Sequence, residues 1–228
     1  MKTYLMMNKL DAFITRKIAF DSPLNEVKEK VNLTGHSLIK FEPLTFDPQI
    51  LTAWVFFYSS NGVRFYLQEL RNKDFLRDVK VATMGKGTSA TFTKLMGRDP
   101  DFIGNGTKEY AILFCNNLGE TITFVKGNNS LSSVEQGLIE ADHKSLVVYN
   151  NEPDYKVPIP DADIYIVTSP LNAQVFERKG KFRPNVKVVA IGKTTKDKLL
   201  ELGYSEVLVP EFPYETSLVN LLNTMIHE

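Results

Sequence analysis

The chain has 228 residues, of which 43% are hydrophobic and 24% charged, and its 27 basic and 27 acidic side chains leave no formal net charge. These values are typical of a soluble globular protein of one or two domains, and they exclude the clustered basic excess of a nucleic-acid-binding protein. The sequence has neither a signal-peptide pattern nor an uncharged apolar run of about 18 residues, so a cytoplasmic protein without a membrane span is expected.

The N-terminal part predicts a strand, a helix and a second strand. Residues 11–18 are typical of a short strand and a turn, and Ser22 with Pro23 form the cap and first-turn proline of a helix from Leu24 to about Leu33. Gly35 is expected to end this helix, and residues 37–41 to form the next strand.

Two proline-rich segments predict how the chain divides into domains. EPLTFDP (42–48) and EPDYKVPIP (152–160) both favour extended backbone. We interpret them as paired linkers through which the chain leaves one domain and later returns to it. Domain 1 would then be residues 1–42 plus 158–228, and domain 2 the insert 43–157.

Strands alternate with helices through the rest of the chain. The apolar runs WVFFY (54–58) and SLVVY (145–149) suit strands that are buried on both faces of a parallel sheet. Alternation of this kind predicts an α/β fold with right-handed crossovers in both domains. Strands are expected at 54–58, 79–84, 121–125, 145–149, 164–168, 187–191 and 206–209, and helices at 62–70, 88–96, 108–118, 131–139, 171–178, 195–202 and 215–226.

One sequence pattern occurs twice. Residues 54–96 and 163–203 each contain a strand, a Ser-containing turn, a helix, a strand, a Gly-Lys turn and a helix. Ser59 and Gly85 are 26 positions apart (85 − 59), and Ser169 and Gly192 are 23 apart (192 − 169). The duplication predicts two similar domains with a ligand held between them.

The turns after the strands are rich in small hydrogen-bond donors. In open α/β sheets such turns face the ligand, and the first amides of the following helices attract anions. The predicted binding residues are Thr15, Arg16, Ser59, Ser60, Asn61, Lys86, Thr88, Asn128, Ser169, Asn172, Thr194 and Thr195. This set favours a polyanion bound without a basic surface, although Ser, Thr and Asn at these places are also ordinary helix caps.

Other chemistries find little support. GKGTSAT (85–91) is not a phosphate loop, and no dinucleotide fingerprint occurs. One cysteine and three scattered histidines, with no pair at ligand spacing, argue against a structural or catalytic zinc site. Cys115 lies among apolar neighbours and is interpreted as a buried hydrophobic residue rather than a nucleophile. Tyr149 ends a strand, where its ring either packs or offers a phenol to the ligand.

Several of these segments resemble the uroporphyrinogen-III synthase family. VKVVAIGKTTKDKLLELGY (186–204) is similar to the family's AIG-x-TT signature, and IVTSPLNA (166–173) and VFFYSSNGVRF (55–65) resemble its two TSPNAV-type elements. ITRK (14–17) resembles its TRP strand end, and SLVVYNNEP (145–153) its VYxT strand. The chain departs from these motifs at Lys17, Tyr58 and Ser60.

The resemblance implies an α/β fold of two flavodoxin-like three-layer domains with mainly parallel sheets, joined by a two-segment linker. It also implies a cyclising lyase that converts hydroxymethylbilane to uroporphyrinogen III, with loss of water and inversion of ring D, and that needs no cofactor or metal. Tyr149 matches the candidate acid, while Ser59, Ser169, Thr194 and Thr195 match donors to the substrate's carboxylates. The expected protein is a monomer whose partner is this small molecule, without nucleic acid or membrane. The alternative is a non-catalytic bilobal module that binds or senses a small anion.

Overall fold

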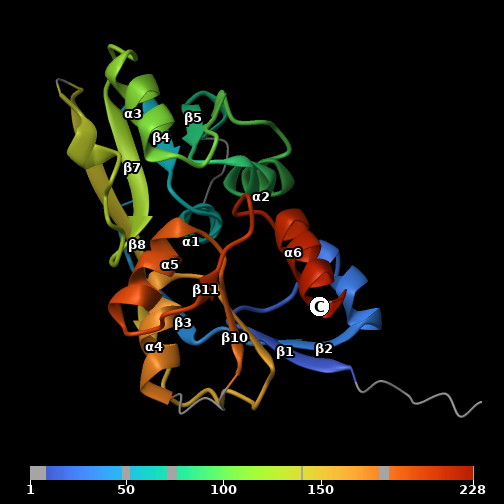
Figure 1. Cartoon of the computed structure of the whole chain (residues 1–228). Helices are drawn as coiled ribbons and strands as arrows, with labels where there is room; N and C mark the ends of the chain where they lie inside the picture. Colours follow the sequence, from blue (N-terminus) through green and yellow to red (C-terminus); the bar gives the residue numbers. More distant parts are fainter. Residues whose placement is uncertain (1–8, 48–51, 71–75, 140, 180–184, 228) are drawn as a thin grey trace, which may run out of the picture. The chain divides into compact units, whose positions relative to one another are not determined.

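The computed structural model describes residues 9–47, 52–70, 76–139, 141–179 and 185–227. Residues 1–8, part of the N-terminus in which no signal peptide is expected, and Pro48 of the first linker segment lie outside the described residues. The chain divides into two compact units, bounded by Met1–Lys40 with Glu152–Glu228 and by Phe41–Asn151. Each unit is a sheet with helices on its faces (Figure 1), and this confirms the predicted α/β class.

The first unit contains a parallel five-stranded sheet in the order β11-β10-β9-β1-β2. Counted along the chain this is the 2-1-3-4-5 order of flavodoxin-like folds. One apolar cluster lies under η1 and α6 and another under α4 and α5, which gives three layers. The elements are β1 (Leu10–Ile14), η1 (Pro23–Glu29), β2 (Val31–Gly35), β9 (Ile164–Val167), α4 (Pro170–Lys179), β10 (Lys187–Ala190), α5 (Lys193–Glu201), β11 (Val207–Leu208) and α6 (Glu215–His227).

The second unit contains a six-stranded sheet in the order β3-β8-β7-β4-β5-β6. Its two apolar clusters lie under α1 and α2 on one face and under α3 on the other. The elements are β3 (Ile39–Pro43), β4 (Trp54–Phe57), α1 (Ser60–Glu69), β5 (Lys80–Thr83), α2 (Lys86–Met96), β6 (Phe102–Ile103), α3 (Lys108–Asn116), β7 (Ile122–Gly127), η3 (Glu135–Gly137) and β8 (His143–Pro153).

Strands β3 and β8, which overlap the two predicted linker segments, pair with each other. The Leu44 amide donates to the Val148 carbonyl at 3.1 Å, and the Asp154 amide to the Leu38 carbonyl at 2.8 Å. Residue numbers fall along one strand as they rise along the other, so this pair is antiparallel, while the other strand pairs of both sheets are parallel.

The two units are permuted copies of one plan. In both sheets the repeated strand-helix-strand-helix segment supplies the centre and one side: β9 and β10 in the first unit, β4 and β5 in the second. The other side is β1 with β2 in the first unit and β7 with β8 in the second. These last strands precede the repeat in the first unit and follow it in the second.

Two predicted helices are wrong, and both fall in the connection between equivalent strands. The helix expected at 24–33 is a 3₁₀ helix that ends at Glu29, followed by strand β2. Val31 and Leu33 are buried while Asn32 is exposed, a period of two that suits a strand. The cap itself is as predicted, since the Ser22 hydroxyl accepts from the Leu24 amide at 3.2 Å.

The helix expected at 131–139 is also missing, and this segment forms only the short η3. Leu131 and Ile139 are 71% and 85% exposed, so the apolar residues that suggested a helix do not share a buried face. The short edge strand β6 was not predicted. Among the described helices, none has the length and apolar character needed to cross a membrane.

Candidate functional site

Within each sheet, the Ser turn and the Gly turn of the repeat end adjacent strands at the same register position. In the second unit Trp54 pairs with Lys80, and in the first unit Ile164 pairs with Lys187. These offsets of 26 (80 − 54) and 23 (187 − 164) equal the spacings between the Ser and Gly turns, so both turns of each repeat lie at the carboxyl edge of adjacent parallel strands. Four helix N-termini therefore open at these edges, two in each unit.

The serine turns have the same geometry in both units. The Ser59 hydroxyl accepts from the Gly62 amide at 3.1 Å, and the Ser169 hydroxyl accepts from the Asn172 amide at 3.1 Å. Each serine thus caps its helix, as the simpler interpretation expected. Each also keeps one hydroxyl proton for another partner.

In the second unit that partner is Tyr149. Ser59 Oγ and Tyr149 Oη are 3.2 Å apart. Ser59 follows β4 and Tyr149 lies in β8, and β7 separates these two strands in the sheet. Sequence analysis selected both residues but did not predict that they meet. The pair is a hydroxyl cluster at the carboxyl edge of the sheet.

Gly127 makes this contact possible. It is the register partner of Tyr149 on β7, and a Cβ built at Gly127 would lie 2.6 Å from the tyrosine ring. Only a residue without a side chain lets the ring extend across β7 towards Ser59. Gly127 was not among the predicted site residues, although a glycine at the end of an apolar strand run was a usable signal.

Aromatic side chains hold the Tyr149 ring from other directions. Phe65 of α1 stacks on it with ring centroids 5.1 Å apart and planes at 24°. Phe41 of β3 lies 5.8 Å away at 56°. These contacts leave Tyr149 only 7% exposed. Burial raises the pKa of the Tyr149 phenol, while the hydrogen bond with Ser59 lowers it in part, so the phenol stays protonated at neutral pH.

The α2 turn lies beside the Ser59 turn. The Ser60 hydroxyl donates to the Gly87 carbonyl at 3.1 Å and accepts from Thr91 at 3.0 Å, which ties the two turns together. Asn61 accepts from Arg64 at 3.2 Å. Lys86 is exposed. Thr88 is 8% exposed, and its hydroxyl has no hydrogen-bond partner among the described residues.

In the first unit three of the predicted binding residues already have side-chain partners within the protein. Thr15 is fully buried and its hydroxyl accepts from the Thr168 amide at 2.9 Å, so it joins β1 to β9 below the edge. Arg16 forms an ion pair with Glu215. The Asn172 side chain is 4% exposed and donates to Ser169 Oγ at 2.9 Å.

The α5 turn repeats the features of the α2 turn. Thr195 is the third residue of α5, as Thr88 is of α2, and it is 1% exposed with no hydroxyl partner in the described parts of the chain. Thr194 is the second residue of α5 and is exposed. Asn128, by contrast, accepts from the Asn151 amide at 2.9 Å and fixes the end of β7 to β8.

Sequence reasoning missed a buried ionic cluster in the second unit. Lys126 Nζ lies 2.7 Å from Glu135 and 2.6 Å from Ser132, and the side chains of Lys126 and Glu135 are 11% and 7% exposed. Tyr58 and Ser145 also donate to Glu135. Burial raises the pKa of Glu135, but the hydrogen bonds from Lys126 and Ser145 outweigh this effect and hold that pKa below its usual range. Every member is partnered, so the cluster fixes the 131–139 segment and offers no free group.

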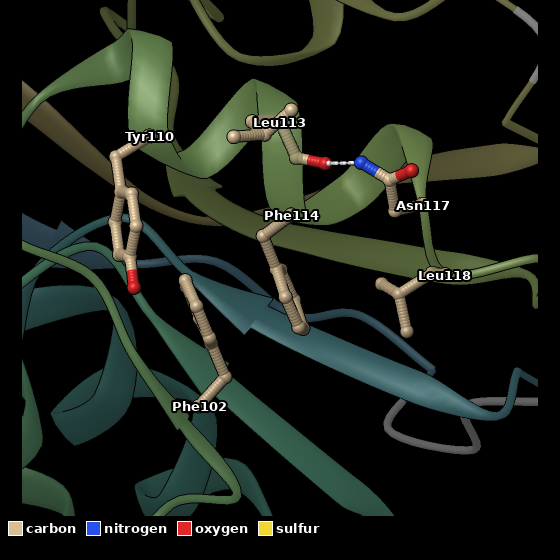
Figure 2. A pocket seen from close by; sticks show the side chains of 6 residues that line it. All are labelled: Phe102, Tyr110, Leu113, Phe114, Asn117 and Leu118. Carbon is tan, nitrogen blue, oxygen red and sulfur yellow. Dashed lines mark hydrogen bonds between the residues drawn. The ribbon is translucent and has the colours of Figure 1, made fainter.

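An apolar groove on α3 is not the site. It is lined by Phe102, Tyr110, Leu113, Phe114, Asn117 and Leu118 (Figure 2). The Asn117 amide is already bound to the Leu113 carbonyl at 2.7 Å, so the groove offers an anion few donors. In the described residues no group of three or more His, Cys, Asp or Glu side chains is arranged to hold a metal ion.

Comparisons with known proteins agree with this arrangement. A family model described as uroporphyrinogen-III synthase HemD matches residues 34–220. The fold is similar to that of a uroporphyrinogen-III synthetase from Helicobacter pylori, with 19% identity, a TM-score of 0.70 and coverage of 95% of this chain and 99% of that one. It is also similar to a mutant uroporphyrinogen III synthase from Thermus thermophilus, with 16% identity, a TM-score of 0.62 and coverage of 96% and 100%. A comparison with curated proteins gave no match.

Proposed function

The chain belongs to the uroporphyrinogen-III synthase family, whose function in haem biosynthesis it shares, and from this premise we propose that it cyclises hydroxymethylbilane to uroporphyrinogen III as a hydro-lyase. The family match supports the reaction. The observation that supports the assignment of roles is the contact between Ser59 and Tyr149 at the carboxyl edge of the second unit.

In the proposed reaction the terminal carbon–oxygen bond breaks, assisted by the electron pair of the neighbouring pyrrole nitrogen. The oxygen takes up a proton and leaves as water, and an azafulvene cation remains. The substituted carbon of ring D attacks this cation and gives a spiro intermediate. The bond from that carbon to the methylene bridge towards ring C then breaks, which leaves a second azafulvene cation on ring C. The free carbon of ring D attacks this second cation and loses its proton, which closes the macrocycle with ring D inverted. No net proton is consumed, so the enzyme needs to position groups more than to supply acid.

Tyr149 is the proposed donor to the departing hydroxyl. Because its pKa is raised, full proton transfer from the phenol would be unfavourable at neutral pH. A hydrogen bond from the phenol to the oxygen that leaves is the better role, and Ser59 orients the phenol for it. Phe65 and Gly127 act on Tyr149 only by fixing where its ring lies.

The carboxylate arms of the substrate are proposed to bind to the helix N-termini of both units. The donors are the first-turn amides of α1, α2, α4 and α5 that no serine caps, together with Thr88, Thr194, Thr195 and the exposed Lys86. Pro170, the first residue of α4, has no amide proton to offer. Hydrogen bonds from such groups to a charged ligand contribute about 1.5–3 kcal/mol each. These contacts provide selectivity, because they present the substituted carbon of ring D, and not its free carbon, to the cation.

The proposal has further parts. The protein is proposed to act as a cytoplasmic monomer without cofactor or metal. The proline-rich segments support domains of residues 1–42 plus 158–228 and residues 43–157. The small-anion sensor remains the second candidate, because ordinary caps explain Ser59 and Ser169 without any chemistry.

The test is to supply freshly prepared hydroxymethylbilane and to separate the product isomers after oxidation. We expect the type III isomer with the protein and the type I isomer in a control without it. A sensor would bind the tetrapyrrole and leave the isomer ratio of the control unchanged, and that result would refute the proposed function.

A further inference from the structure

An exposed aromatic pair lies in the first unit and includes none of the predicted site residues. Phe212 and Tyr214 follow β11 and precede α6, and they are 51% and 42% exposed. Their ring centroids are 6.3 Å apart and their planes differ by 19°, so the two rings are nearly parallel. Exposed aromatic rings do not gain the favourable free energy of removing apolar surface from water, and a ligand that covers them would supply it.

The backbone holds these rings in place. The Tyr214 amide donates to the Phe212 carbonyl at 2.8 Å, which closes a three-residue turn around Pro213. The next residue, Glu215, accepts from the Ser22 hydroxyl at 2.6 Å and pairs with Arg16. The aromatic turn is therefore fixed to the connection that follows β1, and little conformational entropy remains to be lost when a ligand binds.

The same turn lies against the N-terminus of α5. A Cβ built at Gly192 would be 3.4 Å from the Cβ of Pro213. The rings are thus placed next to the turn that carries Thr194 and Thr195, at the carboxyl edge of β10 and β11. An apolar surface and a set of anion donors are side by side on one unit.

A ligand that fits both features has a flat apolar ring with carboxylate arms. Pyrrole rings that bear acetate and propionate arms have this form. We propose that Phe212 and Tyr214 form a stacking surface for a pyrrole ring whose carboxylates bind to the α5 turn. This inference rests on the proposed function for the identity of the ligand, but it concerns residues to which that function assigns no role.

The experiment compares three variants with the wild type. The double variant Phe212→Ala/Tyr214→Ala removes both rings, and Phe212→Tyr/Tyr214→Phe keeps both. Tyr155→Ala is the matched control, because Tyr155 is 43% exposed in the same unit but packs on Arg178 near the end of α4, towards the opposite edge of the sheet. Thermal unfolding first establishes that each variant folds.

Binding is measured by fluorescence titration with uroporphyrin III at low and high salt, and KM and kcat are measured with hydroxymethylbilane. We expect the double alanine variant to bind about tenfold more weakly at both salt concentrations, because stacking of a ring on an aromatic side chain is only weakly screened by ions. KM should rise and kcat stay close to the wild-type value. The ring-preserving variant and Tyr155→Ala should match the wild type.

Binding of the double alanine variant within twofold of the wild type would overturn the proposal, and so would an equal loss in Tyr155→Ala. If the wild type formed only the type I isomer, the proposed function would fail, yet a selective loss of uroporphyrin III binding in the double alanine variant would still support the stacking surface.

Discussion

The two units have the same strand plan but secure it with different polar chemistry. Arg16 and Lys126 occupy equivalent positions in the two units. Arg16 lies two residues after Ile14, which pairs with Ile166 of the central strand β9. Lys126 lies two residues after Phe124, which pairs with Phe56 of the central strand β4. Arg16 pairs with Glu215 where their side chains are 35% and 28% exposed. Lys126 pairs with Glu135 where the exposures are 11% and 7%.

The difference extends to the residue after each central strand. Thr168 in the first unit contacts Thr15, with the two hydroxyls 3.0 Å apart. Tyr58, its equivalent, instead accepts from the Val134 amide at 3.2 Å and donates to Glu135 at 3.1 Å. A helix covers the corresponding face of the sheet in both units, α6 in the first and α3 in the second. Only the connection between the strands differs: it contains η1 in the first unit, whereas in the second it contains only the short η3 and is fixed by the buried ionic cluster. Side-chain hydrogen bonds can therefore fix a segment that does not form the helix expected from its sequence.

The largest expected effect separates the two ion pairs. Lys126→Met should lower the free energy of unfolding by about 3–5 kcal/mol, because it leaves the Glu135 carboxylate buried without its cation. Arg16→Met should lower it by about 1 kcal/mol, since water screens the exposed Glu215. Urea unfolding followed by circular dichroism measures both values.

A double substitution serves as the control for this comparison. Lys126→Met combined with Glu135→Gln removes the uncompensated charge and should recover part of the stability lost in Lys126→Met. Equal losses in Lys126→Met and Arg16→Met would contradict the view that burial distinguishes the two units.

The next effect concerns catalysis and the second unit alone. Tyr149→Phe removes the phenol hydroxyl, and Gly127→Ala places a methyl group 2.6 Å from the tyrosine ring, so each should lower formation of the type III isomer by about 100-fold. Tyr165→Phe in the first unit is the matched control. That phenol accepts from the Ala162 amide at 3.0 Å and donates to the Pro160 carbonyl at 3.1 Å, so its loss should affect stability and leave turnover unchanged.

Turnover is measured as the rate of type III formation at a temperature at which every variant remains folded. Gly87→Ala tests whether glycine loss in general is harmful, because a Cβ there meets no atom within 4 Å. Wild-type rates in both Tyr149→Phe and Gly127→Ala would remove Tyr149 from the mechanism.

These residues also show what a sequence can and cannot predict. Ser59 and Ser169 were identifiable because each follows an apolar run directly and begins a helical pattern. The contact of Ser59 with Tyr149 was not, because it depends on the pairing of β7 with β8, whose register shifts between Lys126 and Gly127. Such a shift is a tertiary property that no local pattern encodes.

The wrong helix at 24–33 has a related cause. Val27 and Val31 are four positions apart, which suits a helix face, yet Val31 also begins a period of two that continues to Leu33. Short apolar segments satisfy both patterns, and the pairing of β2 with β1 decides between them.

A smaller effect is expected on the pH dependence of stability. The folded-state pKa of Glu135 is below its unfolded value of about 4.3, so its contribution is complete above that pH and is lost as the pH falls through the folded pKa. Each unit of difference between the two pKa values corresponds to about 1.4 kcal/mol. Urea unfolding at several pH values below about 6 gives the free energy of unfolding as a function of pH. This free energy should fall less steeply with decreasing pH in Glu135→Gln than in the wild type. Equal slopes would contradict the lowered pKa of Glu135.

The smallest effect tests whether both units bind the substrate. Thr88 and Thr195 are equivalent third residues of α2 and α5, and each has a buried side chain whose hydroxyl has no partner in the described segments. If both donate to substrate carboxylates, Thr88→Ala and Thr195→Ala should each raise KM by about tenfold, and turnover should fall less than in Tyr149→Phe. Thr93→Ala is the control, because its hydroxyl already donates to Asp99 at 2.8 Å, and its KM should not change.

The double variant decides between one binding unit and two. Independent contacts should combine, so Thr88→Ala with Thr195→Ala should raise KM by about 100-fold. A rise in KM in only one of the two single variants would mean that only one unit binds the substrate's carboxylates. The permuted copies would then share a backbone plan while only one of them kept the anion-binding turn in use, and the equivalence of the α2 and α5 turns would be structural and not functional.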